Sequence, residues 1–191
     1  PYLFAGGFGP IDALFEAMSG FTTTGATTIT DLTSVATSLL MWRALSQWVG
    51  GVGIIAMFVA VFPQLAIAGR QLFFAEVPGP SQERLAPRLR STAALVLGVY
   101  AALTLVAALA FRLAGMGTFD AVAHALASLS AGGFSPVPLG MTGYGAAAQW
   151  VAVVFMFLAG VSFPLLYRAV SGQPRSLLRN AELRAYLAIV L

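Results

Sequence analysis

The sequence of 191 residues contains no cysteine and no lysine, and only 9% of its residues are charged. The absence of cysteine excludes a disulfide scaffold, a thiolate metal site and a cysteine nucleophile. Soluble domains carry about a quarter charged residues, whereas here 59% of the residues are hydrophobic and the mean hydropathy is +0.86. These values exclude an ordinary water-soluble fold, and we expect the chain to lie in a lipid bilayer.

Stretches without charged residues predict the membrane spans, because a helix needs about 20 apolar residues to cross the hydrocarbon core. Of three such stretches, the third, between Asp120 and Arg168, is too long for one helix. It contains a Gly/Pro-rich run at 132–140, which predicts a short helix over about 118–130, a loop, and a span over about 146–168. A second short helix is predicted from Ile11 to Phe21. Both are too short to cross a bilayer and are interpreted as re-entrant. The three stretches lie between Arg43 and Arg70, between Arg90 and Arg112, and between Asp120 and Arg168.

The placement of the arginines explains the net charge of +3. Eight of the ten lie in segments 70–90 and 168–184, which the positive-inside rule predicts to be cytoplasmic. The charge therefore indicates orientation, and no nucleic-acid partner is expected. We expect the remaining residues, Arg43 and Arg112, to reach the interface from the outer ends of spans. The same outer position is predicted for three tryptophans, Trp42, Trp48 and Trp150.

An internal repeat joins the two short helices. Segments 12–27 and 120–135 align without gaps, and each has an acidic residue expected to cap the helix, an apolar helix, small or hydroxylated residues, and a glycine. Downstream, Gln47-Trp48-Val49 recurs as Gln149-Trp150-Val151. We infer two copies of one membrane unit, and in membrane repeats the substrate path lies where the copies meet.

The loops after the short helices are the candidate functional segments. Irregular backbone at membrane depth persists only inside protein or beside a water-filled cavity. A helix that enters from outside directs its partially negative C-terminal end toward the centre, and loop carbonyls can replace the hydration shell of an ion. Gly25 and Gly133 permit the positive φ that turns a carbonyl toward an axis. The loops thus predict a filter for a monovalent cation, and the alternative is a plain Thr/Gly-rich turn.

The run from Asp12 to Thr27 strongly resembles the first pore loop of the TrkH-type potassium transporters, in the Trk/Ktr/HKT superfamily. The resemblance covers nearly the whole chain. It implies an all-α polytopic membrane protein with four units around one pathway, each made of a span, a pore helix, a filter loop and a second span. The other matching segments are Trp42-Arg43, 47–55, 75–80, 119–124, 130–135, Tyr167-Arg168 and 182–184.

The resemblance also implies a division of the chain, which would hold two of the four units. Residues 1–70 would contain the pore helix, filter loop and second span of the first unit, followed by a cytoplasmic loop at 71–90. Residues 91–170 would form the complete second unit. Residues 171–191 would contain a cytoplasmic loop and the start of the third unit. We therefore expect the sequence to be an excerpt of a longer protein.

The implied function is potassium uptake across the bacterial cytoplasmic membrane, with the filter loops facing outside and K+ as the transported ion. No catalytic residue, enzymatic activity or covalently bound cofactor is expected. The implied partners are the lipid bilayer, a cytosolic nucleotide-binding regulatory ring of the TrkA type, and a second copy in a homodimer. Carried over residue by residue, the K+ ligands are backbone carbonyls of Thr22, Thr23, Thr24 and Gly25, and of Ser130, Ala131, Gly132 and Gly133.

Several alternatives remain open at this point. Channel and cation symport fit the residues equally, and K+ over Na+ selectivity rests on the resemblance alone. A membrane assembly subunit without a conduction path is a second reading of the chain. Ser135 and His124 suggest an intramembrane serine protease, although both belong to one pore-loop unit. For His124 itself, a polar contact near the start of its helix is favoured over a proton relay.

Overall fold

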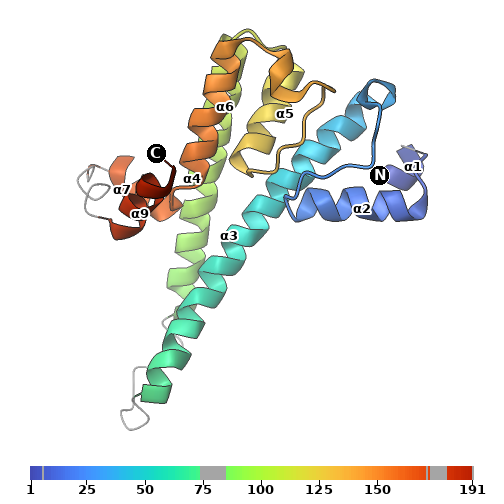
Figure 1. Ribbon diagram of the computed structural model, residues 1–191. Coiled ribbons are helices and arrows are strands. Elements are labelled where there is room, and N and C mark those ends of the chain that lie inside the picture. Colours follow the sequence, from blue (N-terminus) through green and yellow to red (C-terminus); the bar gives the residue numbers. More distant parts are fainter. Residues whose placement is uncertain (6, 74–84, 171, 173–179, 191) are drawn as a thin grey trace.

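A computed structural model describes the chain except for residues 6, 74–84, 171, 173–179 and 191 (Figure 1). All the regular structure in the described part is helical, which confirms the predicted all-α class. The first half contains α1 (Tyr2–Ala5), α2 (Pro10–Phe21), the 3-10 turn η1 (Leu32–Ser34) and α3 (Thr37–Phe73). The second half contains α4 (Leu85–Leu113), α5 (Thr118–Leu129), the 3-10 turn η3 (Gly140–Gly143), α6 (Ala146–Ala159), α7 (Phe163–Val170) and α9 (Ala181–Val190).

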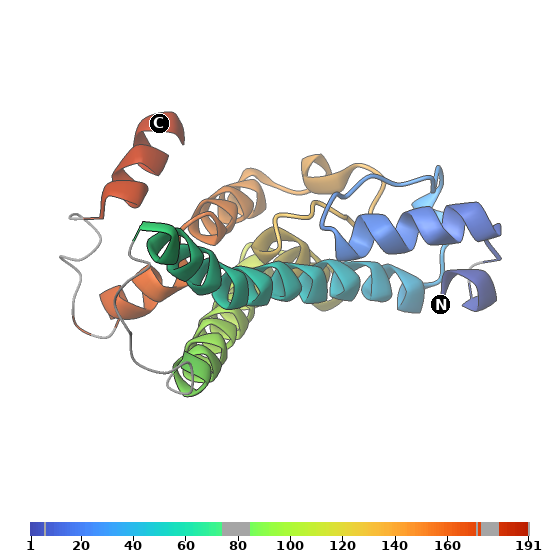
Figure 2. The same ribbon diagram turned by 90° about the horizontal axis from the view of Figure 1, so that it is seen from below.

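The two predicted short helices are α2 and α5, and they occupy different surroundings. Helix α5 packs against α3, α4 and α6, whereas α2 packs against α3 and the short α1 (Figures 1 and 2). The main core lies around α4 and includes Tyr100 and Phe111, both at most 1% exposed. On the outer side of α2, apolar side chains such as Ile11 and Leu14 are exposed. Helix α5 is therefore enclosed by its neighbours, while α2 is held on one side.

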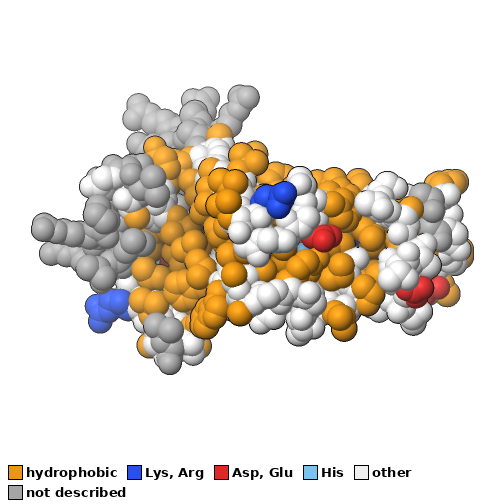
Figure 3. All heavy atoms as spheres, turned by 90° about the horizontal axis from the view of Figure 1, so that it is seen from above, with side chains coloured by type: hydrophobic (Ala, Val, Ile, Leu, Met, Phe, Trp, Pro, Cys, Tyr) orange, Lys and Arg blue, Asp and Glu red, His pale blue; other side chains and the backbone are white. Residues whose placement is uncertain are grey.

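Apolar side chains cover much of the surface, as a bilayer location requires (Figure 3). Within the described residues, one helical segment is long and apolar enough to cross a membrane, the 20 residues Ala94–Leu113 of α4. The bent pair α6 and α7 would be a second if it forms one span. The apolar stretch between Arg43 and Arg70 falls in α3, whose side chains from residue 58 onward lie outside the described part.

The span predicted over 146–168 is not one straight helix. It breaks after Ala159, and the axes of α6 and α7 differ by 102°. Pro164 lies in the first turn of α7, where proline is tolerated because the first amides of a helix have no partner. A continuous helix would need the amide that proline lacks, and the ring would clash with the carbonyl of Gly160. The chain therefore turns at Gly160, which ends α6.

The prediction that Asp12 and Asp120 cap the short helices is wrong. Each lies inside the first turn, and the N-caps are Gly9 and Gly117, neither of which makes a side-chain cap hydrogen bond. Their φ and ψ angles are −59° and 156° in one copy and −58° and 153° in the other. The aspartates still stabilise the helices, because a negative charge near the N-terminus interacts favourably with the partially positive end of the helix dipole.

Several expectations concern residues outside the described part. Arg84, Arg175, Arg179 and the family-like segment 75–80 lie there. The side chains of Arg70, Arg88 and Arg90 also lie outside it. The segments expected to be cytoplasmic over 70–90 and 168–184 therefore remain predictions.

Candidate ion site in two re-entrant loops

The two loops share one backbone conformation. Helices α2 and α5 each contain 12 residues and occupy matching positions of the repeat. Positive φ angles follow at Thr23 (55°) and Gly25 (77°) in the first loop, and at Ala131 (52°) and Gly133 (78°) in the second. The prediction for the two glycines is confirmed. The positive φ at Thr23 and Ala131 was not predicted, and it costs roughly 1–2 kcal/mol at each non-glycine residue.

Hydrogen bonds from each loop to the end of its own helix hold these strained turns. Thr24 N donates to Ser19 O at 3.0 Å, and Gly132 N donates to Ala127 O at 3.0 Å in the second copy. Such bonds satisfy carbonyls that the end of a helix leaves without partners. The repeat seen in the sequence is therefore reproduced in the hydrogen bonds of the loops.

The hydroxyl groups of the loops are directed back toward the helices. The Thr22 hydroxyl donates to Met18 O at 2.7 Å, and the Ser130 hydroxyl lies 3.0 Å from Leu126 O. Both hydroxyl groups therefore donate their protons to a carbonyl of the helix that precedes them. Among the described residues no group of three or more His, Asp or Glu side chains could hold a metal ion. The loops therefore offer a cation uncharged oxygens, chiefly backbone carbonyls, rather than carboxylates.

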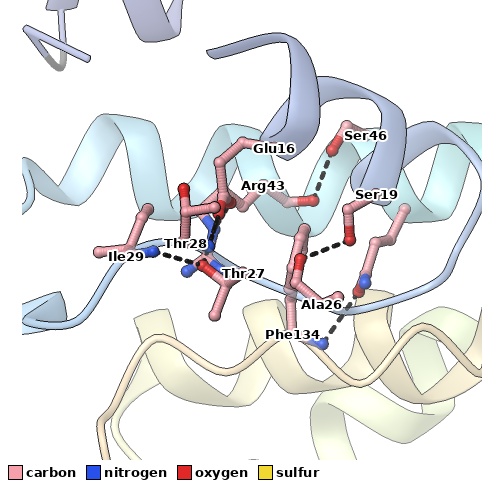
Figure 4. Close-up of polar contacts among 10 residues, drawn as sticks. Glu16, Ser19, Ala26, Thr27, Thr28, Ile29, Arg43, Ser46 and Phe134 are labelled. Atoms are coloured by element: carbon pink, nitrogen blue, oxygen red, sulfur yellow. Dashed lines mark hydrogen bonds and ion pairs between the residues drawn. The ribbon is translucent and has the colours of Figure 1, made fainter. Parts of the chain in front are cut away.

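The outer limb of each loop is latched to its helix at one equivalent position. In the first copy, Glu16 Oε1 accepts hydrogen bonds from Thr27 Oγ1 at 2.6 Å and from Thr28 N at 2.7 Å (Figure 4). In the second copy, His124 Nε2 lies 3.2 Å from Ser135 Oγ. The first latch has a carboxylate as acceptor, and the second is an imidazole–hydroxyl contact.

This equivalence gives His124 and Ser135 a structural role. His124 Nδ1 lies 2.8 Å from Asp120 O, and Ser135 Oγ accepts a hydrogen bond from Val137 N at 3.1 Å. A hydroxyl that also receives an amide proton from its own turn is held as a turn-forming group. The geometry favours the polar-contact interpretation of His124 over a proton relay or a serine nucleophile.

A buried ion pair lies behind the first loop. Arg43 Nε is 3.2 Å from Glu16 Oε2, and the side chains are 2% and 0% exposed. The guanidinium carbon of Arg43 lies 4.1 Å from the ring centroid of Phe134, which belongs to the second loop. The prediction that Arg43 reaches the interface is therefore wrong. A charge withdrawn from water needs a counter-charge, and the carboxylate of Glu16 with the face of an aromatic ring supplies it here.

Trp48 also differs from its prediction as an interfacial anchor. Its indole Nε1 donates to Thr104 Oγ1 at 3.0 Å, and its ring packs against Tyr100 with centroids 5.3 Å apart. These contacts join α3 to α4. Trp150, the equivalent residue of the second copy, is 68% exposed, as an anchor would be.

The two loops meet at a pair of glycines. A Cβ atom at Gly25 would overlap with the carbonyl oxygen of Gly132. The structure thus brings together residues from both predicted sets of ligands at this point. Thr22, Thr24, Ala131 and Gly133 are exposed, while Ser130 and Gly132 are buried. This loop-to-loop contact joins the two halves of the candidate site.

Helix α3 fits between the two loops because of two further glycines. A Cβ at Gly50 would overlap with Phe21 O at the end of α2, and one at Gly51 would lie 2.7 Å from the Tyr100 hydroxyl and 3.2 Å from Ser130 Cβ. Small residues allow such close approach. Close helix packing is therefore the role of glycine at these two positions.

Near the loops, an exposed carboxylate caps the 3-10 turn η1. Asp31 Oδ1 accepts hydrogen bonds from Thr33 Oγ1 at 2.6 Å and from Thr33 N at 2.9 Å. Hydrogen bonds to a carboxylate favour its charged form, so the Thr33 side chain first and then its amide lower the pKa of Asp31. A fixed negative charge is therefore held on the segment that links the first loop to α3.

Two residues of the site were not found from the sequence. Arg43 and Gln47 lie on α3, and both contact the second loop. The signal for Arg43 was present, since it and Glu16 are opposite charges in an otherwise apolar region. For Gln47 the signals were the family-like segment 47–55, which assigns it no role, and the repeated Gln-Trp-Val triplet, which does not distinguish its two copies.

Comparisons with known proteins place these features in a family. Residues 5–188 match the family model for TrkH, described as a cation transport protein. The chain is 38% identical over 183 residues to the Trk system potassium uptake protein TrkH of Vibrio parahaemolyticus. It is 40% identical over 185 residues to the Trk system potassium uptake protein TrkG of Escherichia coli. These alignments cover 93% and 95% of this chain, but 38% of the length of each relative.

The fold agrees with a solved structure of the same group. The crystal structure of the potassium transporter TrkH from Vibrio parahaemolyticus matches with a TM-score of 0.81 and 34% sequence identity. The match covers 95% of this chain and 36% of that one. It supports the predicted repeated helical units, and a membrane location agrees with the apolar composition. The chain belongs to the TrkH family of cation transport proteins.

Proposed function

We propose that this chain provides two walls of a potassium uptake pathway, in which K+ exchanges its hydration shell for backbone carbonyls. The observation that carries the proposal is that two loops with matching positive-φ turns, one at Gly25 and one at Gly133, meet where Gly25 faces the carbonyl oxygen of Gly132. The proposed ligands are the carbonyl oxygens of Thr22, Thr23, Thr24 and Gly25 with those of Ser130, Ala131, Gly132 and Gly133.

Physical chemistry favours a monovalent cation at this place. The eight proposed ligand residues carry no charged side chain, and carbonyl dipoles bind a monovalent ion firmly enough to admit it and weakly enough to release it. The C-terminal ends of α2 and α5 lead into the loops and add negative potential there. Potassium is the ion in the names of the relatives, and this supports K+ as the cargo.

The same proposal includes orientation and partners. The filter loops face outward in the bacterial cytoplasmic membrane, and the arginine-rich segments 70–90 and 168–184 face the cytosol. A cytosolic nucleotide-binding ring of the TrkA type docks on that inner face, and two copies of the full-length protein form a dimer. The relatives are named as parts of a Trk system, which supports a protein with partners.

The test is ion flux through the purified full-length protein in liposomes. We expect K+ and Rb+ flux that exceeds Na+ flux. Changing Gly25 to Ala should abolish the K+ flux, because the added methyl group overlaps with Gly132 O and strains a residue at φ 77°. The matched control is Gly98→Ala on α4, where an added Cβ meets nothing within 4 Å.

Each result decides between the proposal and its alternatives. Absence of K+ flux from the wild-type protein would favour the assembly subunit. Wild-type flux through the Gly25→Ala variant would contradict the assignment of the loops as the filter. Cleavage of a membrane substrate that is lost in Ser135→Ala would favour the protease.

A further inference from the structure

Gln47 crosses from one unit of the repeat to the other. The residue lies on α3 of the first unit, and its side chain is 0% exposed. Its Oε1 accepts a hydrogen bond from Phe134 N, in the second loop, at 3.1 Å, which is the dashed line at Phe134 in Figure 4. A buried amide proton without this acceptor would cost about 1–3 kcal/mol. The second loop thus depends on a side chain from the first unit.

The other end of the same amide faces the first loop. A Cβ at Gly25 would lie 3.6 Å from Gln47 Nε2. Among the described residues, this buried nitrogen has no hydrogen-bond partner. The amide group therefore stands between the two loops, with its acceptor engaged by the second and its donor facing the first.

The side chain of Gln47 occupies the space that a side chain at position 132 would need. A Cβ at Gly132 would overlap with Gln47 Cδ and lie 2.5 Å from Oε1 and 2.6 Å from Nε2. Gly132 is not one of the glycines with positive φ, so its backbone would accept other residues. The adjacent glycines therefore have separate causes, since Gly133 supplies a φ of 78° and Gly132 makes room for the amide.

The bond to Phe134 N has a consequence for the preceding carbonyl. A peptide unit is planar and trans, so its N–H and C=O point in opposite directions. When Gln47 holds the Phe134 N–H, the Gly133 C=O in the same peptide unit must point away from Gln47. Glycine does not fix this orientation from its own side of the peptide unit, because no Cβ opposes rotation about ψ of residue 133. The hydrogen bond to Gln47 helps to hold it.

We infer that Gln47 is a positioning residue that keeps the Gly133 carbonyl turned toward the ion path and thereby sets the discrimination between K+ and Na+. The inference rests on the proposed function, because Gly133 is one of the proposed ligands. Gln47 does not touch the ion. It acts through the backbone of the second loop, and it fixes the spacing between that loop and Gly25.

The repeat provides a matched control. Gln149 belongs to the equivalent Gln-Trp-Val triplet, but its side chain is exposed and its Nε2 donates to Tyr144 O at 3.0 Å. Its amide therefore makes a local contact before α6 and holds no amide proton of a filter loop. The same substitution at the two glutamines separates the positioning role from a general effect of losing a glutamine.

The experiment measures K+, Rb+ and Na+ fluxes through the full-length protein in liposomes. Gln47→Leu keeps the size of the side chain but removes the acceptor. We expect its K+/Na+ flux ratio to fall about tenfold, the factor that corresponds to one lost buried hydrogen bond. Gln47→Glu keeps an acceptor for Phe134 N and should stay within about threefold of the wild-type ratio. Gln149→Leu should leave the ratio unchanged.

The readouts distinguish positioning from mere stability. A structural defect lowers the amount of folded protein and scales all fluxes together, whereas a turned Gly133 carbonyl changes the ratio of ions and the KM for K+. A wild-type ratio and KM in Gln47→Leu would overturn the inference. If that variant does not fold, loss of discrimination in Gln47→Glu, which retains the acceptor, would overturn it as well. Absence of K+ flux in the wild-type protein would refute the proposed function instead.

Discussion

Arg43 and Glu16 form an ion pair, 3.2 Å from Nε to Oε2, in which neither side chain is more than 2% exposed. The pair joins α3 to α2, and the same carboxylate also holds Thr27 and Thr28 of the first loop. The Glu16 carboxylate thus links a long helix, a short helix and a candidate ion-binding loop.

Breaking this pair from one side should be costly. Changing Arg43 to Gln leaves the Glu16 carboxylate buried without its cation, and we expect a loss of about 3–5 kcal/mol in the free energy of unfolding. Thermal unfolding of the full-length protein in detergent provides the measurement. The double variant Glu16→Gln/Arg43→Gln should be more stable than Arg43→Gln, because no unpaired charge remains. If the double variant loses as much unfolding free energy as the single variants Arg43→Gln and Glu16→Gln together, this account is contradicted.

The two latches should differ in strength. Thr27→Val removes a hydrogen bond to a carboxylate, which is worth about 1.5–3 kcal/mol, together with the acceptor for Ile29 N. Ser135→Ala removes a contact with His124 and an acceptor for Val137 N, and neutral bonds of this kind contribute about 1 kcal/mol. Unfolding midpoints of both variants, measured together, test the order. Ion flux should persist in Ser135→Ala, and equal losses of stability in the two variants would mean that the charge of Glu16 is irrelevant to the latch.

The two positive-φ glycines should respond differently to alanine. At Gly133 an added Cβ meets nothing within 4 Å, so the substitution costs only the backbone strain of about 1–2 kcal/mol. At Gly25 the same strain is joined by overlap with Gly132 O. We expect Gly133→Ala to retain part of the uptake and Gly25→Ala to lose it. Growth of an uptake-deficient strain across a series of potassium concentrations measures this, and identical growth defects would exclude the steric difference.

Helix α3 provides a comparison of packing glycines. Gly50→Ala should lower the unfolding midpoint, because the new methyl group overlaps with Phe21 O at the end of α2. Gly53→Ala, three residues further along the same helix, meets nothing within 4 Å and should be neutral or stabilising by up to about 1 kcal/mol. The difference between the two midpoints is the quantity to measure. A Gly50→Ala protein as stable as Gly53→Ala would show that α2 shifts freely.

Periodicity and glycine placement predicted the parts of this fold that depend on local sequence. The short helices over Ile11 to Phe21 and 118–130 are present as α2 and α5, and the positive φ of Gly25 and Gly133 agrees with the freedom of glycine to adopt it. These features depend on residues within one turn of each other. The register of the repeat could therefore be read without any tertiary information.

The parts that were missed depend on contacts between distant segments. A charged residue near the end of an apolar stretch normally reaches the interface, and the opposite charge of Glu16, 27 positions away, does not by itself indicate that Glu16 and the Phe134 ring surround Arg43. Gln47 and Gln149 occupy identical triplets, yet only the packing of α3 buries the first. The break at Gly160 was missed because an apolar composition gives the length of a span but not its direction.

Helix α3 belongs to the first unit in sequence but to both loops in its contacts, since Gln47 bonds to Phe134 N and Gly51 lies beside Ser130. One copy of the repeat consequently cannot be exchanged independently of the other. A chimaera that takes its second loop from a relative must take α3 from the same relative. Otherwise the loop residues that contact Gln47 and Arg43 will not match these side chains. Because Arg43 on α3 also pairs with Glu16 on α2, the boundary for exchange between relatives falls outside the segment from α2 to the second loop, rather than in the connection between the units.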